Sequence, residues 1–152
     1  MVNSTKDFRS EGPLGPMDLV FAEREITRVL YRYAHAVDRR VFDQIAPCYW
    51  PDGRDNRVDG SIDDYVAWLR EVLPNVATST HQYTNVLIDV DLASGTAQSE
   101  AYCLNVSVFA DPVAHGAARL TTVLRYLDEW HRRDGEWRIL TRVVVRDWAH
   151  ED

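Results

Sequence analysis

The sequence predicts an α+β fold in which helices come first and a sheet of long antiparallel strands follows. Apolar residues recur at helical spacing across residues 26–37 and again across residues 62–73. From Thr80 to Trp148 the pattern changes to strand-like stretches separated by turns. No internal repeat or low-complexity segment interrupts this order, so we expect a single domain over residues 17–149. Residues 1–16 are polar and broken by glycine and proline, and they are predicted to form a flexible arm.

Composition limits the classes of partner. The 152 residues are 45% hydrophobic and 11% aromatic, which is typical of a folded globular chain. The formal charge is -7 without a Lys/Arg-rich block, which argues against nucleic acid and against anionic membranes. Five Trp and seven Tyr suit a cavity lined with rings, although the same rings fill ordinary cores.

Several kinds of site and location are not expected. Cys48 and Cys103 lack metal or redox spacing, so we interpret them as buried thiols of a reducing cytoplasm. No apolar run reaches membrane-spanning length, and the beginning of the sequence lacks a signal-peptide core. Histidine spacings typical of metal sites and glycine motifs that hold phosphates are also missing, so neither a metal nor a cofactor is expected.

The helices are predicted from caps and apolar spacing. The first is capped by Asp18 and runs to Asp38, and a second, short helix over residues 41–46 is stopped by Pro47. Residues 48–53 indicate an aromatic edge followed by a turn. A third helix begins at the capping box of Ser61 and Asp64 and continues until Pro74.

The strands are predicted over residues 80–90, 96–110, 117–131 and 136–147, with hairpin turns at 91–95 and 133–135 and a loop at 111–116. The first of these strands is predicted to carry the functional face of the sheet. Its alternation puts His81, Tyr83, Asn85 and Leu87 on one face, which we interpret as the inside of a pocket.

Asp38, His81 and Arg142 are the candidates for chemistry. A histidine takes a proton from carbon or oxygen when a carboxylate on its other ring nitrogen fixes the tautomer, and an arginine on the pocket wall stabilises an anion. Each residue taken alone also fits a structural role. Asp38 fits a solvated helix end, His81 a strand-edge side chain bonded to backbone or water, and Arg142 a surface ion pair.

Three stretches, taken in order, carry a family resemblance. They are Ile26-x-x-x-Leu30-x-x-x-Ala34-x-x-Val37-Asp38-Arg39-Arg40, then Thr80-His81-x-x-Thr84-Asn85, then Asp128-x-Trp130-x-Arg132-x-Asp134-Gly135-x-Trp137-Arg138-Ile139-x-x-Arg142. Together they resemble the SnoaL-like, scytalone dehydratase-like branch of the nuclear transport factor 2-like superfamily. The resemblance implies a cone, in which a curved antiparallel sheet surrounds a deep cavity and the N-terminal helices pack on its concave face.

The resemblance also implies a catalytic pair. In the dehydratase and dehydrochlorinase members of the superfamily, an Asp at the end of the first helix and a His at the start of the first long strand form a dyad. Asp38 and His81 match these positions, and Arg142 matches a catalytic Arg on the last strand of the dehydrochlorinase. Scytalone dehydratase has a second catalytic His on the next strand, where residues 102–106 here contain none, which argues against scytalone as the substrate. The substrate-binding candidates are Tyr33, Trp50, Tyr83, Asn85 and Tyr102.

We therefore expect a cofactor-independent lyase, a dehydratase or a related eliminating enzyme, that acts on a hydrophobic ring compound by His-Asp acid/base chemistry. One alternative is an isomerase or polyketide-type cyclase that uses the same dyad. Another is a ligand-binding module or an assembly protein like the small subunits of dioxygenases. Because the strands over residues 96–110 and 117–127 are apolar on both faces, we also expect a homodimer or homotrimer.

Overall fold

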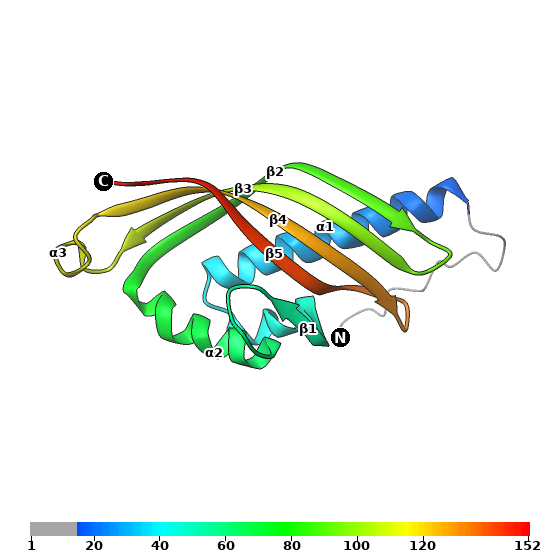
Figure 1. Cartoon of the computed structure of the whole chain (residues 1–152), viewed down its shortest axis with the longest axis horizontal. Helices are drawn as coiled ribbons and strands as arrows, with labels where there is room; N and C mark the ends of the chain where they lie inside the picture. The colour runs from blue at the N-terminus through cyan, green and yellow to red at the C-terminus, as the bar shows by residue number, and fades with distance from the viewer. Residues whose placement is uncertain (1–14) are drawn as a thin grey trace, which may run out of the picture.

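The structure is a computed structural model that describes residues 15–152, and it has the predicted α+β architecture. Two helices pack against a single five-stranded sheet with the strand order β1-β5-β4-β3-β2 (Figure 1). The main elements are α1 Pro16–Asp38, β1 Tyr49–Asp55, α2 Ile62–Val72, β2 Val76–Asp91, β3 Thr96–Phe109, β4 Arg119–Arg133 and β5 Glu136–Glu151. The short ones are η1 Phe42–Gln44, η2 Ala46–Cys48, η3 Leu73–Asn75 and α3 Pro112–His115.

Helix α1 begins two residues earlier than the predicted cap at Asp18. Gly15 is the N-cap and Pro16 the first helical residue, where a missing N–H costs nothing. The Asp18 carboxylate, now one turn inside, accepts a hydrogen bond from the Gly15 N–H at 2.8 Å. Of the predicted flexible arm, residues 1–14 lie outside the described residues, and the last two belong to the start of α1.

Residues 41–55 differ from the prediction. The expected helix over residues 41–46 is two 3-10 turns, η1 and η2, because Pro47 has no N–H to donate and restricts the residue before it. The expected edge and turn at residues 48–53 is instead part of β1, which pairs in parallel with β5. Gly53 permits this pairing, since a Cβ there would lie 2.9 Å from the Trp50 carbonyl oxygen.

Helix α2 follows its sequence signals closely. Ser61 Oγ accepts from the Asp64 N–H at 3.2 Å, and the Asp64 carboxylate accepts from the Ser61 N–H at 2.8 Å. The helix ends at Val72, and Pro74 lies in the 3-10 turn η3 that leads into β2. The predicted capping box is therefore present in full.

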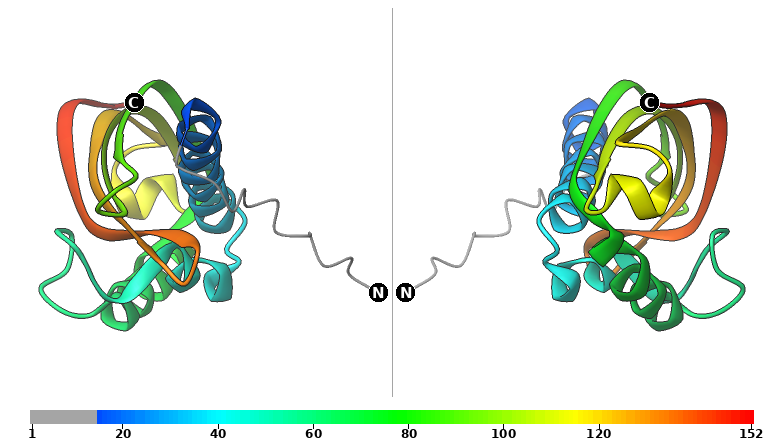
Figure 2. Two further views of the ribbon diagram at one scale, coloured as in Figure 1. Left: turned by 90° about the vertical axis from the view of Figure 1, so that its right-hand side faces the viewer. Right: turned by 90° about the vertical axis from the view of Figure 1, so that its left-hand side faces the viewer.

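The sheet is mixed and strongly curved. Strands β2, β3, β4 and β5 form an antiparallel meander, and only β1 runs parallel to its neighbour. Seen end-on, the sheet curls around α1 on one side and α2 below (Figure 2). Three long strands are displaced by a few residues from their predicted bounds, and the predicted loop at 111–116 contains the single turn α3.

A bulge in β2 divides the face that alternation predicted. The pairing of β2 with β3 shifts between Thr84 and Leu87, where Asn85 has a φ of 48°. Val86 and Ile88, rather than Leu87, therefore pack on the core, and Leu87 is 73% exposed. The predicted inward face is correct only for the residues before the bulge.

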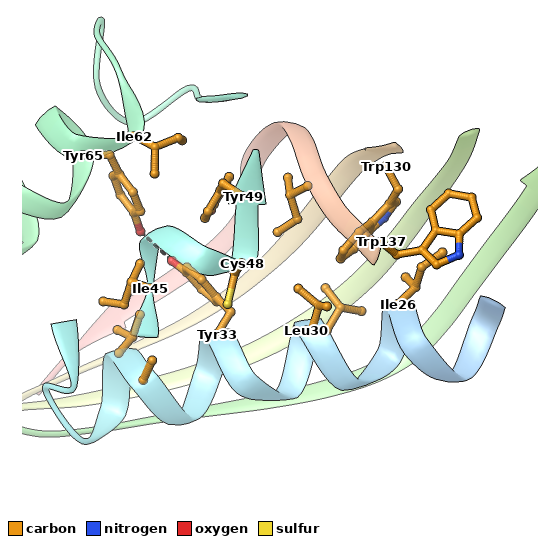
Figure 3. Close-up of a cluster of buried hydrophobic side chains, with 14 of the residues drawn as sticks. Ile26, Leu30, Tyr33, Ile45, Cys48, Tyr49, Ile62, Tyr65, Trp130 and Trp137 are labelled. Atoms are coloured by element: carbon orange, nitrogen blue, oxygen red, sulfur yellow. Dashed lines mark hydrogen bonds between the residues drawn. The ribbon is translucent and has the colours of Figure 1, made fainter. Parts of the chain in front are cut away.

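The core lies between α1 and the concave face of the sheet. Ile26 and Leu30 of α1 face Trp130 and Trp137 from the hairpin of β4 and β5 (Figure 3). One helical turn further along, Tyr33 meets α2, and its hydroxyl lies 2.5 Å from that of Tyr65. The core is thus apolar toward the start of α1 and hydroxyl-rich toward the end of α1, where Asp38 lies.

Candidate active site

Asp38 and His81 form the pair that the sequence predicted. His81 Nδ1 lies 2.6 Å from Asp38 Oδ1, and the backbone N–H of His81 donates to Asp38 Oδ2 at 2.9 Å. The carboxylate is held by the last residue of α1 and the imidazole by the first half of β2. Both are mostly shielded, with side chains 19% and 9% exposed respectively. The predicted hydrogen-bond contact is confirmed.

The contact indicates which ring nitrogen of His81 carries a proton. An ionised carboxylate can only accept hydrogen bonds, so the proton between the two groups belongs to Nδ1 of His81. In the neutral ring, Nε2 then carries the free lone pair and is the nitrogen that can accept a proton. The pair therefore has the geometry of a base oriented by a carboxylate.

The ionised form of Asp38 is favoured in the fold. Burial raises the pKa of Asp38, but the hydrogen bonds and the charge of His81, with a further hydrogen bond from Ser79, bring it below its usual value. Ser79 Oγ donates to Asp38 Oδ1 at 2.9 Å. Asp38 is thus a carboxylate at neutral pH, as an orienting partner must be.

Arg40 ties the end of α1 to the start of β2. Its backbone adopts a φ of 59°, which turns the chain back just after the helix. Its guanidinium donates to the carbonyl oxygens of Asp38 at 2.7 Å and Val76 at 2.8 Å, and to Ser79 Oγ at 3.0 Å. Together with the hydrogen bonds of Asp38 to Ser79 and to the His81 N–H, this side chain holds the two elements that carry the dyad.

Asn105 lies on the other side of the imidazole. It pairs directly with His81 across β2 and β3, and its Nδ2 lies 3.2 Å from His81 Nε2. Ser107 Oγ donates to Asn105 Oδ1 at 3.2 Å, which fixes the amide with its N–H groups toward the ring. The same amide nitrogen lies 3.4 Å from His81 Nδ1 and donates to the Thr80 carbonyl oxygen at 3.3 Å, so Asn105 packs against the imidazole and helps to hold its position.

A surface hollow of about 440 Å³ reaches both members of the dyad. It lies between the last turn of α1 and the first residues of β2, an edge strand of the sheet. Its lining residues are Ala34, His35, Asp38, Arg39 and residues 77–81. The hollow connects the dyad with solvent at this edge.

Arg142 is fully buried and ion-paired. Its Nε and Nη2 donate to the two carboxylate oxygens of Asp128, both at 2.7 Å, and both side chains are 0% exposed. Burial is the largest single influence and lowers the pKa of Arg142, but the charge and hydrogen bonds of Asp128 together with the neighbouring tyrosines raise it well above its usual value, so the pair is ionic. The surface ion pair that remained open from the sequence is therefore excluded by burial.

Tyrosine rings surround the guanidinium of Arg142. Its Cζ lies 4.4 Å from the ring centroids of both Tyr33 and Tyr126 and 5.8 Å from that of Tyr49. Such contacts place the positive charge over the negative faces of the rings. Arg142 is thus part of the wall of the concave interior.

A second arginine, Arg57, is partly buried and closes this region from the loop after β1. Arg57 donates to Tyr33 Oη at 2.8 Å and forms an ion pair with Asp55 at 2.6 Å. Its Cζ lies 4.6 Å from the Tyr65 ring centroid. The interior is therefore covered on this side by a network of phenols and paired charges.

The structure places the predicted substrate-binding residues in different environments. Tyr33 and Tyr83 lie inside, next to Arg142 or to its tyrosine neighbours. Asn85 is exposed at the β2 bulge, and Tyr102 lies on the outer face of β3 with 37% exposure, because only the alternate residues of β3 face inward. Trp50 is buried far from the dyad, where its Nε1 donates to the His131 carbonyl oxygen at 2.8 Å.

Sequence reasoning missed Asn105, Tyr126, Arg40 and Ser79. Asn105 and Tyr126 are on strands whose inward face the sequence did not separate from the outer face, since both faces are apolar. Arg40 follows Asp38 by two residues, but its side chain reaches β2 only because its backbone is left-handed, and no sequence pattern reports that conformation. A β2–β3 pairing derived from the hairpin at residues 91–95 was the one available signal for Asn105 opposite His81.

Other classes of site find no support in the described chain. Among residues 15–152, no group of three or more His, Cys, Asp or Glu side chains is arranged to hold a metal ion. In the same range, none of the helices is both long and apolar enough to cross a membrane.

Comparison with known proteins gives the family context. Residues 20–143 match the SnoaL-like domain family. An uncharacterized protein of Mycobacterium tuberculosis and one of Mycobacterium bovis are each 35% identical over 127 residues, covering 80% of this chain and 83% of theirs.

Two solved structures share the fold. A hexachlorocyclohexane dehydrochlorinase from Novosphingobium barchaimii superposes with a TM-score of 0.79 at 16% identity, over 91% of this chain and 94% of its own. A candidate scytalone dehydratase from Novosphingobium aromaticivorans gives 0.78 at 17% identity, over 88% and 89%. At these identities the likeness shows the fold alone.

Proposed function

Because the chain belongs to the SnoaL-like domain family, we propose that it is a cofactor-independent lyase of the dehydratase type. The observation that carries the proposal is the 2.6 Å contact between Asp38 and the Nδ1 of His81, which leaves Nε2 as a base. The substrate would be a hydrophobic ring compound, since the interior beside the dyad is lined mainly by rings.

In the proposed reaction, His81 Nε2 takes a proton from a ring carbon. The electron pair of that C–H bond forms the new double bond, and a hydroxyl leaves the neighbouring carbon with its bonding pair. The proton held by the imidazolium then goes to the departing hydroxyl, which leaves as water. Asp38 stabilises the imidazolium between these steps without becoming protonated.

Arg142 or a neighbouring tyrosine would stabilise the charge that develops on the substrate. Because Asp128 occupies one edge of the Arg142 guanidinium, only Nη1 remains for the substrate. A positioned base contributes about 10²–10⁴-fold to the rate, so the shape and polarity of the interior must supply much of the rest.

The proposal takes its type of reaction, an elimination, from the names of two structural neighbours, whose likeness by itself shows the fold alone. These names describe a dehydratase and a dehydrochlorinase, and both reactions remove a group and a proton from adjacent carbons. Isomerisation or cyclisation by the same dyad, and binding without turnover, are the competing functions.

The test is product formation from a panel of cyclic alcohols that carry an acidic carbon next to the hydroxyl-bearing carbon. Wild-type protein should release water after exhaustive chelation and without added nucleotide. Asp38→Asn should lower the rate by about 10²–10⁴-fold while keeping the fold, because an amide cannot stabilise the imidazolium. Asp43→Asn, at an exposed position of η1, is the matched control and should leave the rate unchanged.

Two results would contradict the elimination. Rearranged or cyclised products without loss of water would favour the isomerase or cyclase, and binding without any product would favour a ligand-binding module. Loss of activity on chelation would contradict the cofactor-independent mechanism.

A further inference from the structure

One exposed side of α1 is apolar near its start and basic further along, and we call it the α1 face. Met17, Val20 and Phe21 are large apolar side chains that lie exposed, and Arg24 and Arg28 follow at helical spacing on the same side. The guanidinium groups of Arg24 and Arg28 have no acidic partner within residues 15–152. In a chain with a net charge of -7, this face is a patch of opposite sign.

The outer face of the sheet carries a hollow of the complementary kind, with a volume of about 490 Å³, which we call the sheet hollow. It is formed by two rows of residues that pair across β2, β3, β4 and β5. The first row is Leu87, Glu100, Leu127 and Val143, and the second begins at Asp89 and includes Glu129. Among the described residues that line the hollow, none is basic.

The carboxylates of the sheet hollow are weakly paired. Glu100 Oε1 lies 3.6 Å from Arg125 Nη1, and Glu129 Oε1 lies 3.4 Å from His131 Nε2. The Asp89 carboxylate has no hydrogen-bond or ion-pair partner in the part of the chain that the structure describes. The hollow therefore offers free negative charge beside exposed apolar side chains, which is the complement of the α1 face.

Two sheet hollows are a poor match for each other. A two-fold contact brings the same surface of both copies together, so the carboxylates of one hollow would meet those of the other. Like charges in an interface cost free energy. The α1 face avoids this cost, because it brings apolar side chains to Leu87 and Val143 and guanidinium groups to the carboxylates.

The two surfaces also agree in size. Four strands spaced about 4.8 Å apart make the hollow about 14 Å long, and the helix from Met17 to Arg28 covers about 16 Å. Arg24 and Arg28 are one helical turn apart, about 6 Å, and Glu100 and Glu129 lie on a diagonal of about 7–8 Å. Both arginines can therefore reach a carboxylate in one docked position.

We propose that the α1 face of one copy docks into the sheet hollow of a second copy, so that the chain assembles head to tail. Figure 2 shows α1 and β5 on opposite sides of the molecule, so each copy presents its two surfaces to different neighbours. A contact between two different surfaces does not end at two copies, and here it closes as a ring. Of the assemblies expected from the sequence, the homotrimer fits this contact and the homodimer does not.

The contact is separate from the dyad. Arg24 lies about 21 Å along α1 from Asp38, and none of the residues that line the sheet hollow lines the hollow that reaches His81. Loss of assembly and loss of the proposed activity are therefore different results.

The experiment uses one variant for each surface and sedimentation velocity at micromolar concentration. The α1 variant combines Arg24→Glu with Arg28→Glu, and the hollow variant is Leu87→Glu. Each variant alone should dissociate about tenfold or more readily than wild type, because carboxylates then meet carboxylates or enter an apolar contact. Arg54→Glu, at an exposed position of β1, is the matched control and should assemble like wild type.

Mixing the two variants is the decisive step. The hollow variant keeps an intact α1 face and the α1 variant keeps an intact hollow, so an equimolar mixture should form a complex of one copy of each. This recovery would also show that both variants are folded. Unchanged assembly of the α1 variant would show that sheet meets sheet instead. That result, a mixture that stays monomeric, or a monomeric wild type would overturn the proposal.

Discussion

The ion pair of Arg142 and Asp128 is a single contact with large structural consequences. Both side chains are 0% exposed, and Asp128 accepts two hydrogen bonds from the guanidinium. Removing one partner leaves the other charge buried without compensation, whereas removing both leaves only apolar surface. The pair therefore couples the stability of the interior to the chemistry of the site.

Asp128→Asn should lower the free energy of unfolding by about 3–5 kcal/mol, because Arg142 then stays buried without a counter-charge. Urea denaturation measures the effect. The matched control is Asp147→Asn, which removes the partner of Arg125 in a partly exposed pair and should cost about 1 kcal/mol or less. Equal losses in the two variants would contradict the role assigned to burial.

The ionisation of Asp38 predicts a pH dependence of stability. Its pKa is lowered in the fold, so its contribution is complete above the unfolded pKa of 3.8 and is lost as the pH falls through the lower folded value. The difference in unfolding free energy between wild type and Asp38→Asn should therefore shrink between pH 5 and pH 2. A difference that stays constant over this range would show that the carboxylate is not favoured by the fold.

The dyad was predictable from sequence, and its surroundings were not. Caps and a change of period locate Asp38 at the end of one element and His81 at the start of another, but it was the family resemblance that predicted them as a pair. The side chains that complete the site depend on which face of a strand points inward. That face could not be assigned for Tyr102 and Asn105, because β3 is apolar on both sides.

Among the elements, the junction of α1 and β2 decides the geometry of the dyad. Arg40 alone links the carbonyl oxygens of Asp38 and Val76 with the Ser79 hydroxyl. Its replacement would leave the hydrogen bonds of Asp38 to Ser79 and to the His81 N–H at this junction but remove the bonds to the backbone of both elements. The distance between His81 and Asp38 would then be held less tightly.

Arg40→Met should reduce the rate by about 10²-fold, the effect of misplacing a catalytic group by about 1 Å, without changing the apparent affinity for the substrate. Steady-state kinetics separate the two parameters. Arg28→Met, at an exposed position earlier in α1, is the matched control and should not affect the rate. A parallel loss in the control would show that α1 tolerates neither change, against a specific role for Arg40.

Helices α1 and α2 and the antiparallel meander of β2 to β5 were predictable, and the irregular parts were not. The α2 capping box and the two hairpin turns are local signals, and each is present in the fold. The parallel pairing of β1 with β5 joins residues about 90 positions apart, so no local pattern reports it. The bulge at Asn85 likewise requires a residue with a left-handed backbone. Asparagine tolerates this conformation, but its presence in the sequence does not predict it.

The outer face of the sheet carries the features of an interface. Leu87, Leu104 and Val143 are 73%, 37% and 38% exposed, and a hollow of about 490 Å³ on this side is lined by Leu87, Val143 and residues from β3 and β4. Apolar surface gathered in this way favours association. We therefore retain the prediction of a homodimer or homotrimer formed through the sheet.

Sedimentation at micromolar concentration should show a species larger than the monomer. Leu87→Glu should raise the dissociation constant by about tenfold or more without unfolding the chain, because a charge would enter an apolar contact. Val113→Glu, at a position 93% exposed in α3, is the matched control and should not change the assembly. A monomeric wild type would contradict the prediction.

The most direct measurement of the central claim is solvent-deuterium exchange at the acidic carbon of the cyclic alcohols in the substrate panel, followed by NMR in D₂O. Wild-type protein should accelerate the exchange, because Nε2 of His81, oriented by Asp38, removes the proton. His81→Ala should fall to the rate without protein, and His150→Ala, at an exposed position of β5, should match wild type. Equal exchange with wild type and His81→Ala would show that His81 is not the base, and the proposed enzyme mechanism would then be wrong.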